Sequence, residues 1–448
     1  MYKQTMTAVL ALAGLSSIGV HAADAAPQGF IEGSKASVSS RTMYFNNDNR
    51  VGGADQKETA EGLLFNYLSG YTQGTIGFGV DAQALVGIHL DGGKGHHPDS
   101  NTFFPSDSDG SAEKSWSRGG ANVKAKLSKT ELKIGSALQP SLPILVANDG
   151  RLLPQTFQGG MLSSKEFDGV TVNAGKITQA AGRASSNWAG LSIAGATQES
   201  NNFQYGGVDW KITKDLTVQA YHSQLEDFYK QTFLGLVHVY PISEGQTFKT
   251  DLRYFDSRSD GKNGQAGYAF NNNNGYAKNA NEVDNKTWSA MFTYALGGHA
   301  LTLGHQRVND DGGFVYMSNG NITDSRGRNE GEGGSSFYLF TDSMINQFVR
   351  AGENTTFGQY TYDFTGLGVP GLKAGIAYLH GDNIKDIGNG GDHSEWERDM
   401  RIDYVVQTGP LKNFGATLRH GVYRGDDSGS VRDTDQTRLI FNYTYNFL

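Results

Sequence analysis

Most of the chain alternates apolar residues with polar or small ones, which is the period of a β-strand. Over residues 76–90 one face carries, in order, Ile76, Phe78, Val80, Ala82, Ala84, Val86 and Ile88. The opposite face of that segment is mostly Gly, Asp, Gln and His, and residues 287–296 and 438–447 repeat the arrangement. Long runs of this period predict an all-β protein of antiparallel strands, each with one apolar face.

The make-up of the two faces indicates that the apolar side points outward, into lipid. The polar faces combine Gly, Asp, Lys and Arg, as a water-filled lumen would. The apolar faces end in Tyr, Phe and Trp, which are suited to the two interfaces of a bilayer. The runs also match the about 9–11 residues of a tilted membrane strand. A soluble secreted β-protein with its apolar faces inward is the alternative.

The connections between the predicted strands have two lengths. Some are tight, namely Ser128–Lys129, 213–215 and Gly297–Gly298. Others are long and rich in Asn, Asp and Gly, namely 91–115, 256–285, 308–335 and 381–397. Short turns at one end and long loops at the other are typical of outer-membrane barrels. At about 23 residues per strand and connection, the chain predicts roughly 16–20 strands in a single domain.

The first 22 residues predict an export signal. Lys3 supplies a positive start, Ala8–Val20 is mostly apolar, and small residues allow cleavage after Ala22. The apolar run is too short to span a bilayer as a helix. We therefore expect residues 23–448 to form the mature transmembrane barrel, with a buried first helix or an uncleaved anchor as the alternative.

Charge and composition exclude several other functions. The formal net charge is −8 and no basic block occurs, which argues against nucleic acid as a partner. The absence of cysteine excludes a disulfide scaffold and thiolate chemistry. Because no catalytic or metal-binding motif stands in a supporting context, we expect neither an enzyme nor a cofactor.

Several segments resemble the OprD family of substrate-specific outer-membrane porins. They run in family order from residue 29 to the end: 29–37 with Arg41 and 44–46, 142–145 with 148–157, 302–309, 368–372, 404–412 and 418–420. The resemblance implies an 18-stranded barrel in the bacterial outer membrane, with a lumen narrowed by loops. It also implies uptake of small carboxylic acids, including amino acids, along a ladder of basic side chains. The alternating aromatic end, Tyr443 to Leu448, looks like a closing strand recognised by the barrel assembly machinery.

The strand parity independently predicts a ladder of inward cations. On the last four predicted strands and the first, the side chains opposite the apolar face include Arg41, Lys373, Arg401, Arg419 and Arg438. Those strands become neighbours only if the barrel closes. Guanidinium groups could then grip carboxylates with paired hydrogen bonds. The alternative is that each cation pairs with a wall carboxylate such as Asp403 or Asp435.

A second predicted feature is a constriction loop. The irregular, proline-bounded stretch Asn148–Phe157 resembles the inward-folded third loop of the family and contributes Asn148, Asp149 and Arg151. Asp149 and Arg151 could face the two charges of a zwitterion. The resemblance places an acidic side at Asp342 and Ser343, although the residues that follow, Met344–Val349, depart from the family pattern.

Together these features predict a channel for passive, selective uptake of small carboxylate-containing molecules. Two alternatives stay open, namely a non-selective diffusion porin and a plugged structural or enzymatic outer-membrane barrel. The expected partners are the carboxylate substrates, outer-membrane lipid and the assembly machinery, with weak homo-oligomers as a further option.

Overall fold

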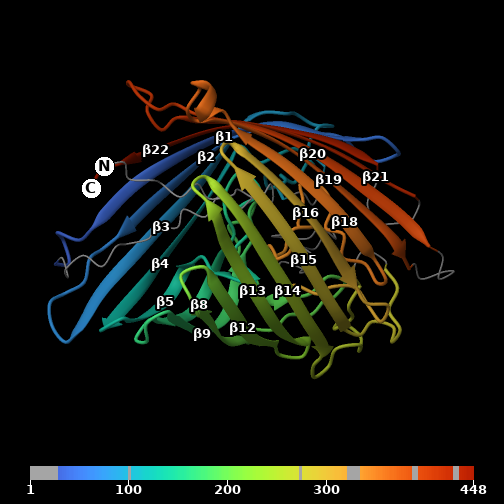
Figure 1. Cartoon of the computed structure of the whole chain (residues 1–448), viewed down its shortest axis with the longest axis horizontal. Helices are drawn as coiled ribbons and strands as arrows, with labels where there is room; N and C mark the ends of the chain where they lie inside the picture. The colour runs from blue at the N-terminus through green and yellow to red at the C-terminus, as the bar shows by residue number, and fades with distance from the viewer. Residues whose placement is uncertain (1–28, 99–101, 272–274, 320–332, 386–391, 427–432) are drawn as a thin grey trace.

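Eighteen antiparallel strands form one sheet that closes on itself (Figure 1). In the computed structural model they are β1 (Lys35–Asn49), β2 (Gln56–Leu68), β3 (Ile76–Asp91), β4 (Ser115–Leu127), β5 (Thr130–Leu138), β8 (Thr156–Ser164), β9 (Val170–Ala181), β11 (Phe203–Lys211), β12 (Leu216–Leu225), β13 (Tyr229–Ser243), β14 (Gln246–Ser259), β15 (Asp284–Leu296), β16 (His299–Val308), β18 (Asn354–Asp363), β19 (Leu372–Ile384), β20 (His393–Val405), β21 (Gly415–Gly425) and β22 (Thr434–Asn446).

The structure describes residues 29–98, 102–271, 275–319, 333–385, 392–426 and 433–448. The predicted export signal, residues 1–22, lies outside them. None of the described residues forms a helix long and apolar enough to cross a membrane. The one described helix is the short 3-10 turn η1 (Phe364–Leu367).

The barrel is closed by the pairing of its last strand with its first. β22 pairs with β1 over a register that runs from Ser37 opposite Asn446 to Asn49 opposite Thr434. Every other strand pairs with its neighbours in sequence. No strand of this sheet is therefore left with an unpaired edge, which is the condition for a sheet to sit in hydrocarbon. The prediction of a barrel of about 18 strands is confirmed.

The two faces of the wall point as the alternation predicts. On β3, Phe78 is 57% exposed while Asp81 is 4% exposed. On β15, Trp288 is 42% exposed while its neighbour Thr287 is fully buried. Large apolar side chains thus cover the outside of the barrel, and polar ones line its inside together with apolar ones that pack against the inner loops, such as Phe233 and Phe255. This is the reverse of a soluble sandwich.

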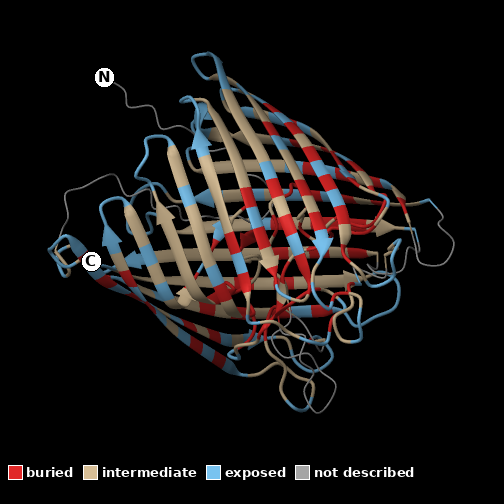
Figure 2. Cartoon of the chain, turned by 90° about the horizontal axis from the view of Figure 1, so that it is seen from below, coloured by how far each residue is buried: buried red, intermediate tan, exposed pale blue. Residues whose placement is uncertain are grey.

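Short turns gather at one end of the barrel and long loops at the other. The predicted tight turns 128–129, 213–215 and 297–298 all lie at the end where β1 begins and β22 finishes. We call this the short-turn end and the opposite one the long-loop end. Buried residues are concentrated toward the long-loop end (Figure 2). The cause is loops that fold into the lumen.

Three strand boundaries differ from the sequence prediction. Thr156 and Phe157, expected in the irregular loop, begin β8, because they pair with Ala181 and Ala180 of β9. Val406, expected on the outward face of a strand, lies in the turn after β20, where its N–H donates to the Phe414 carbonyl. Phe447 follows β22, although its N–H still donates to the Ala36 carbonyl at 2.8 Å.

The wall contains a close contact between a glycine and an aromatic ring. A Cβ added to Gly207 of β11 would lie 2.1 Å from the Tyr221 ring of β12. That ring is held in place, because its hydroxyl donates to Asp209 and accepts from Asn173 Nδ2 at 2.9 Å. The neighbouring Gly206 faces outward, and nothing lies within 4 Å of its added Cβ.

We therefore predict that Gly207→Ala destabilises the barrel by about 1–3 kcal/mol, the usual cost of overpacking. The matched variant Gly206→Ala, one residue away on the same strand, should leave stability almost unchanged. Urea unfolding in detergent micelles measures both. Equal unfolding midpoints for the two variants would show that the Tyr221 ring moves aside.

Candidate functional site

Three of the loops that fold into the lumen bond to one another. Inner loop 1 (139–155) contains the hairpin β6 (Ser141–Leu142) and β7 (Leu145–Val146), and inner loop 2 (182–202) contains β10 (Leu191–Ser192). Inner loop 3 (309–353, described at 309–319 and 333–353) contains β17 (Ser318–Asn319). Strand β10 pairs with β17, and Val146 bridges to Ser336. The loops therefore form one partition inside the barrel.

Asn148 links all three inner loops. Its side-chain carbonyl accepts from Arg183 of inner loop 2 at 3.0 Å and from the Gly150 N–H at 3.0 Å. Its side-chain amide donates to the Gly334 carbonyl of inner loop 3 at 3.2 Å. The sequence placed Asn148 in the constriction loop, and the structure gives it this connecting position.

Arginines on the wall hold the partition by donating to loop carbonyls. Arg41 of β1 binds both oxygens of Asp149 at 2.7 and 3.0 Å and also the Arg151 carbonyl at 2.8 Å. Arg118 of β4 donates to the carbonyls of Pro154 and Gly182, which belong to inner loops 1 and 2. These bonds satisfy carbonyls that an irregular backbone would otherwise bury unpaired.

Carboxylates on β20 hold inner loop 3 by accepting hydrogen bonds from its backbone N–H groups. Glu397 accepts from the N–H groups of Ile345 and Asn346 at 2.8 and 2.7 Å. Asp399 accepts from the Met344 N–H at 3.2 Å. Residues 344–346 are therefore fixed by the same wall strand that carries Arg401 and Asp403.

Arg438 of β22 joins the wall to two of the loops at once. Its guanidinium is buried and donates to the Gly150 carbonyl of inner loop 1 at 3.1 Å. It also donates to the Met344 carbonyl of inner loop 3 at 2.7 Å and to the Gln436 side chain. We call this three-way contact the Arg438 bridge. It fixes the spacing of the two loops against the wall.

The predicted ladder residues lie on contiguous strands, and three of them form a row. Arg401 lies opposite Arg419, and Arg419 lies opposite Arg438, across β20, β21 and β22. Strands of a barrel tilt by about 40° and lie about 4.8 Å apart, so each step along the row changes height by about 3 Å. Lys373 and Arg41 lie two and four residues from this row, toward the short-turn end.

Three of the five ladder residues form described ion pairs with carboxylates, and a fourth, Arg419, interacts electrostatically with Asp399 and Asp403. Arg41 pairs with Asp149, and Lys373 lies 3.1 Å from Asp363. Arg401 binds both oxygens of Asp403 on its own strand, at 2.6 and 2.8 Å. The pairs of Lys373 and Arg401 match the alternative of pairing with a wall carboxylate, whereas Arg41 pairs with a carboxylate of inner loop 1.

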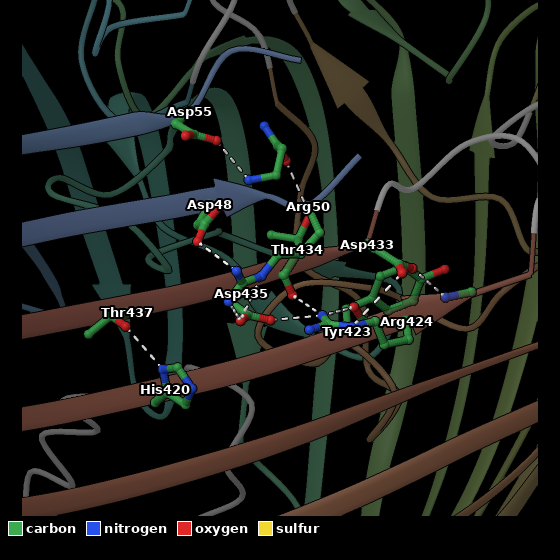
Figure 3. Close-up of polar contacts among 12 residues, drawn as sticks. Asp48, Arg50, Asp55, His420, Tyr423, Arg424, Asp433, Thr434, Asp435 and Thr437 are labelled. Atoms are coloured by element: carbon green, nitrogen blue, oxygen red, sulfur yellow. Dashed lines mark hydrogen bonds and ion pairs between the residues drawn. The ribbon is translucent and has the colours of Figure 1, made fainter. Parts of the chain in front are cut away.

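Asp435, the other wall carboxylate considered, lies on the outward face. It accepts from Arg424 at 2.7 Å and from the Nε of Arg50 at 3.0 Å. Figure 3 shows this network at the long-loop ends of β21, β22 and β1, together with Asp48 and Asp433. Asp435 therefore does not neutralise the lumen cations.

A cluster of four arginines lies where the partition meets the wall. Arg438 interacts electrostatically with Arg151 of inner loop 1, Arg419 of β21 and Arg183 of inner loop 2, and Asp399 of β20 is the carboxylate that offsets part of this positive charge. The guanidiniums of Arg151 and Arg438 lie 5.0 and 5.5 Å from the centre of the Phe45 ring, which stabilises cations held over an aromatic face. We call these four residues the arginine cluster.

The two loop arginines of the cluster remain charged at neutral pH. Burial, with the nearby charges of Arg183 and Arg419, lowers the pKa of Arg151 to about 9. Burial likewise lowers the pKa of Arg183 to about 10, against the opposing pull of Asp342. The arrangement therefore places four arginines beside the carboxylates Asp342 and Asp399 in a confined space, and the excess of positive charge there attracts anions.

Asp342 of inner loop 3 is the carboxylate that faces these loop arginines. Burial raises the pKa of its carboxyl to about 6, although bonds from Ser336 and the Phe337 N–H and the charges of Arg183 and Arg151 oppose the rise. No described ion pair within 4 Å joins Asp342 to either arginine. The hydroxyl of the adjacent Ser343 donates to the Asn346 carbonyl at 2.6 Å, within its own loop.

Several of these residues were missed by reasoning from the sequence. Arg183 lies in 182–202, a stretch without alternation that could have been recognised as a long inward connection. Arg118 and Glu397 follow the lumen parity of their strands, but parity does not distinguish a loop anchor from a free lumen charge. Phe45 lies on the lumen face, where the pattern predicts polar side chains.

The Arg438 bridge gives a prediction about loop mobility. Arg438→Gln removes the guanidinium that bonds Gly150 and Met344, so amide hydrogens in 148–155 and 341–349 should exchange at least tenfold faster. Arg401→Gln is the matched control, because Arg401 pairs with Asp403 on its own strand. Hydrogen–deuterium exchange followed by mass spectrometry measures both. Unchanged exchange in Arg438→Gln would mean that the other anchors suffice.

Comparisons with known proteins agree with this architecture. Residues 28–447 match the family model described as outer membrane porin, OprD family. The chain is 33% identical to Porin D of Pseudomonas aeruginosa over 437 residues, covering 94% of this chain and 93% of that protein. It is 32% identical to the porin-like protein GalP of Pseudomonas putida over 426 residues, covering 94% of each.

Solved structures give the same result. The crystal structure of Pseudomonas aeruginosa OccK8 (OprE) is 43% identical with a TM-score of 0.84, covering 94% of this chain and all of that one. Pseudomonas aeruginosa OpdK with vanillate is 33% identical with a TM-score of 0.80, at the same coverage. From its sequence and its closed 18-stranded barrel, the chain belongs to the OprD family of substrate-specific porins of the bacterial outer membrane.

Proposed function

We propose that the channel takes up small carboxylate-containing molecules, amino acids or other organic acids, by passive diffusion past the arginine cluster. The single observation that carries this proposal is the meeting of Arg151 and Arg183 from the loops with Arg419 and Arg438 from the wall. Four guanidinium groups in one confined region favour a solute with concentrated negative charge. The long loops mark the extracellular end of the barrel, and the short turns mark the periplasmic end.

The chemistry of guanidinium suits a carboxylate substrate. A planar guanidinium can bind both oxygens of a carboxylate with parallel hydrogen bonds, and it stays charged. Arg41 already binds Asp149 in this way within the molecule. Several sites of moderate strength suit transport better than one tight site, because the solute must also leave.

The ion pairs formed by the wall cations limit where a negatively charged solute can be held. The charges of Arg41, Lys373 and Arg401 are balanced by Asp149, Asp363 and Asp403. We therefore propose that the arginine cluster exerts the main attraction on the carboxylate. The paired cations then contribute more weakly to its path toward the periplasm. Asp342, across from Arg151 and Arg183, offers a partner to the ammonium group of an amino acid.

A relative supports the proposed class of substrate. OpdK of Pseudomonas aeruginosa was crystallised with vanillate, which is an aromatic carboxylate. The chain is 33% identical to that protein over nearly its whole length. Small carboxylates are thus a chemically consistent class for a channel with this cluster, and a non-selective pore is the outcome to test against.

Neutralising the cluster should reduce carboxylate flux selectively. In the triple variant Arg151→Gln, Arg183→Gln, Arg419→Gln, we expect uptake of a small carboxylate into liposomes to fall about tenfold, since a hydrogen bond to a charged group contributes about 1.5–3 kcal/mol. Uptake of a neutral sugar should change less than twofold. Single-channel recording would verify that the variant still conducts.

The matched control removes three exposed lysines from periplasmic turns, in Lys129→Gln, Lys214→Gln, Lys412→Gln. It should transport both solutes as the unaltered protein does. If the cluster variant lost carboxylate and sugar flux equally, the arginines would only support the wall, and the channel would be a general diffusion pore.

The titration of Asp342 leads us to predict that the anion selectivity of the channel rises as the pH falls. Its pKa is raised to about 6, so the carboxyl is mostly ionised at pH 7.5 and mostly neutral at pH 5. Arg151 and Arg183 stay protonated over that range, so the constriction gains up to one positive charge on acidification. Reversal potentials in a KCl gradient should therefore shift toward anions at pH 5. The Asp342→Asn channel should be more anion-selective than the unaltered one at pH 7.5, and its selectivity should change little between pH 7.5 and pH 5. If its selectivity changed with pH as much as that of the unaltered channel, groups other than Asp342 would cause the change.

A further inference from the structure

The outer wall carries an apolar groove across strands β9 and β11–β15. Its volume is about 920 Å³, and most of its lining belongs to outward-facing residues of two adjacent rows. One row runs through Trp210, Val218, Leu236 and Leu252, each opposite the next across the sheet. The other runs through Val208, Ala220, Leu234, Tyr254 and Trp288 in the same way. In Figure 1 the strands β12–β15 form the green-to-yellow front of the wall.

The groove has a direction relative to the membrane. It begins near the periplasmic ends of β9 and β11, at Val170 and Trp210, and reaches the extracellular half of β15 at Trp288. Small side chains such as Ala220 form its floor, while Trp210, Leu234 and Trp288 are 49%, 50% and 42% exposed along its length. Tryptophan is typical of membrane interfaces. The groove therefore crosses much of the hydrocarbon layer.

Two exposed cations stand at the extracellular end of the groove. Arg307 of β16 lies opposite Trp288 in the register, and Lys286 precedes Trp288 by two residues on the same outward face of β15. The described residues include no ion pair to Lys286. Arg307 lies 3.7 Å from Asp310, and that carboxylate lies closer to Lys385, at 3.1 Å.

Cations farther from the groove are neutralised by neighbours. Lys230 lies 2.7 Å from Asp260, and Arg258 lies 2.8 Å from Asp256 and 3.3 Å from Asp284. Lys286 lies opposite Asp256 in the register and two residues from Asp284, but Arg258 pairs with both of these carboxylates, so Lys286 and Arg307 leave a net positive charge directly above the apolar groove.

We propose that this sector binds a phosphorylated, acylated lipid of the outer leaflet, with its phosphate on Lys286 and Arg307 and an acyl chain in the groove. A basic group at the headgroup level above an apolar slot matches both parts of such a lipid. A second copy of the chain would bury these cations against its own wall. The outward carboxylates nearest to these cations, Asp256 and Asp284, already pair with Arg258.

Native mass spectrometry of the full barrel, purified in detergent and stripped of lipid, tests the proposal with diphosphorylated lipid A as the probe. Lys286→Gln, Arg307→Gln should weaken binding at least tenfold. Ala220→Trp, which fills the floor of the groove, should weaken binding of lipid A and leave binding of its deacylated diphosphorylated disaccharide unchanged. Lys214→Gln, Lys412→Gln at periplasmic turns removes the same charge and should bind as the unaltered protein does.

All the substituted residues lie on the outer surface or in turns, and heat-modifiable gel migration reports whether each variant is folded. Equal loss of lipid A binding in Lys286→Gln, Arg307→Gln and in Lys214→Gln, Lys412→Gln would overturn the proposal, since general charge would then explain binding. A barrel dimer that excludes lipid A and is abolished by Ala220→Trp would also overturn it, by assigning the groove to a second copy.

Discussion

The pairing of β22 with β1 is the contact on which the rest of the molecule depends. In hydrocarbon no water can satisfy an open sheet edge, so each backbone N–H and C=O of the wall needs a neighbouring strand. Once the sheet closes, half of every strand faces an enclosed space, and this half can be polar. The closure also places β1 beside β22, which brings Arg41 next to the cations of β19–β22, far away in the sequence.

Charged groups of the wall stabilise the inner loops together with apolar packing. The inner loops are irregular, so their N–H and C=O groups need partners that no strand ladder supplies. Arg41, Arg118 and Arg438 donate to their carbonyls, and Glu397 and Asp399 accept from their amides. Apolar residues of the wall and loops, among them Phe255, Phe314 and Phe337, pack alongside. The residues that stabilise the constriction therefore belong to the same set of charges that gives the lumen its electrostatic character.

The sequence predicted the barrel well because its signal is local and repeated. The period-2 alternation set the strand faces, and parity correctly turned Arg401, Arg419 and Arg438 inward. The meeting of Arg183 with Arg151 could not be read in the same way, because it depends on contacts between two irregular loops. Asp149 was read as a charge for the substrate, yet Arg41 binds both of its oxygens. Pairing of this kind depends on rotamers and loop paths, which periodicity does not encode.

The central claim is that the arginine cluster selects solutes for their carboxylate. The most direct measurement is uptake by liposomes of a small carboxylate and of its neutral amide, matched in size, through the unaltered channel at neutral pH. The account predicts that the carboxylate enters several times faster than the amide and that added salt reduces the difference. Equal rates for the pair at low and high salt would contradict it.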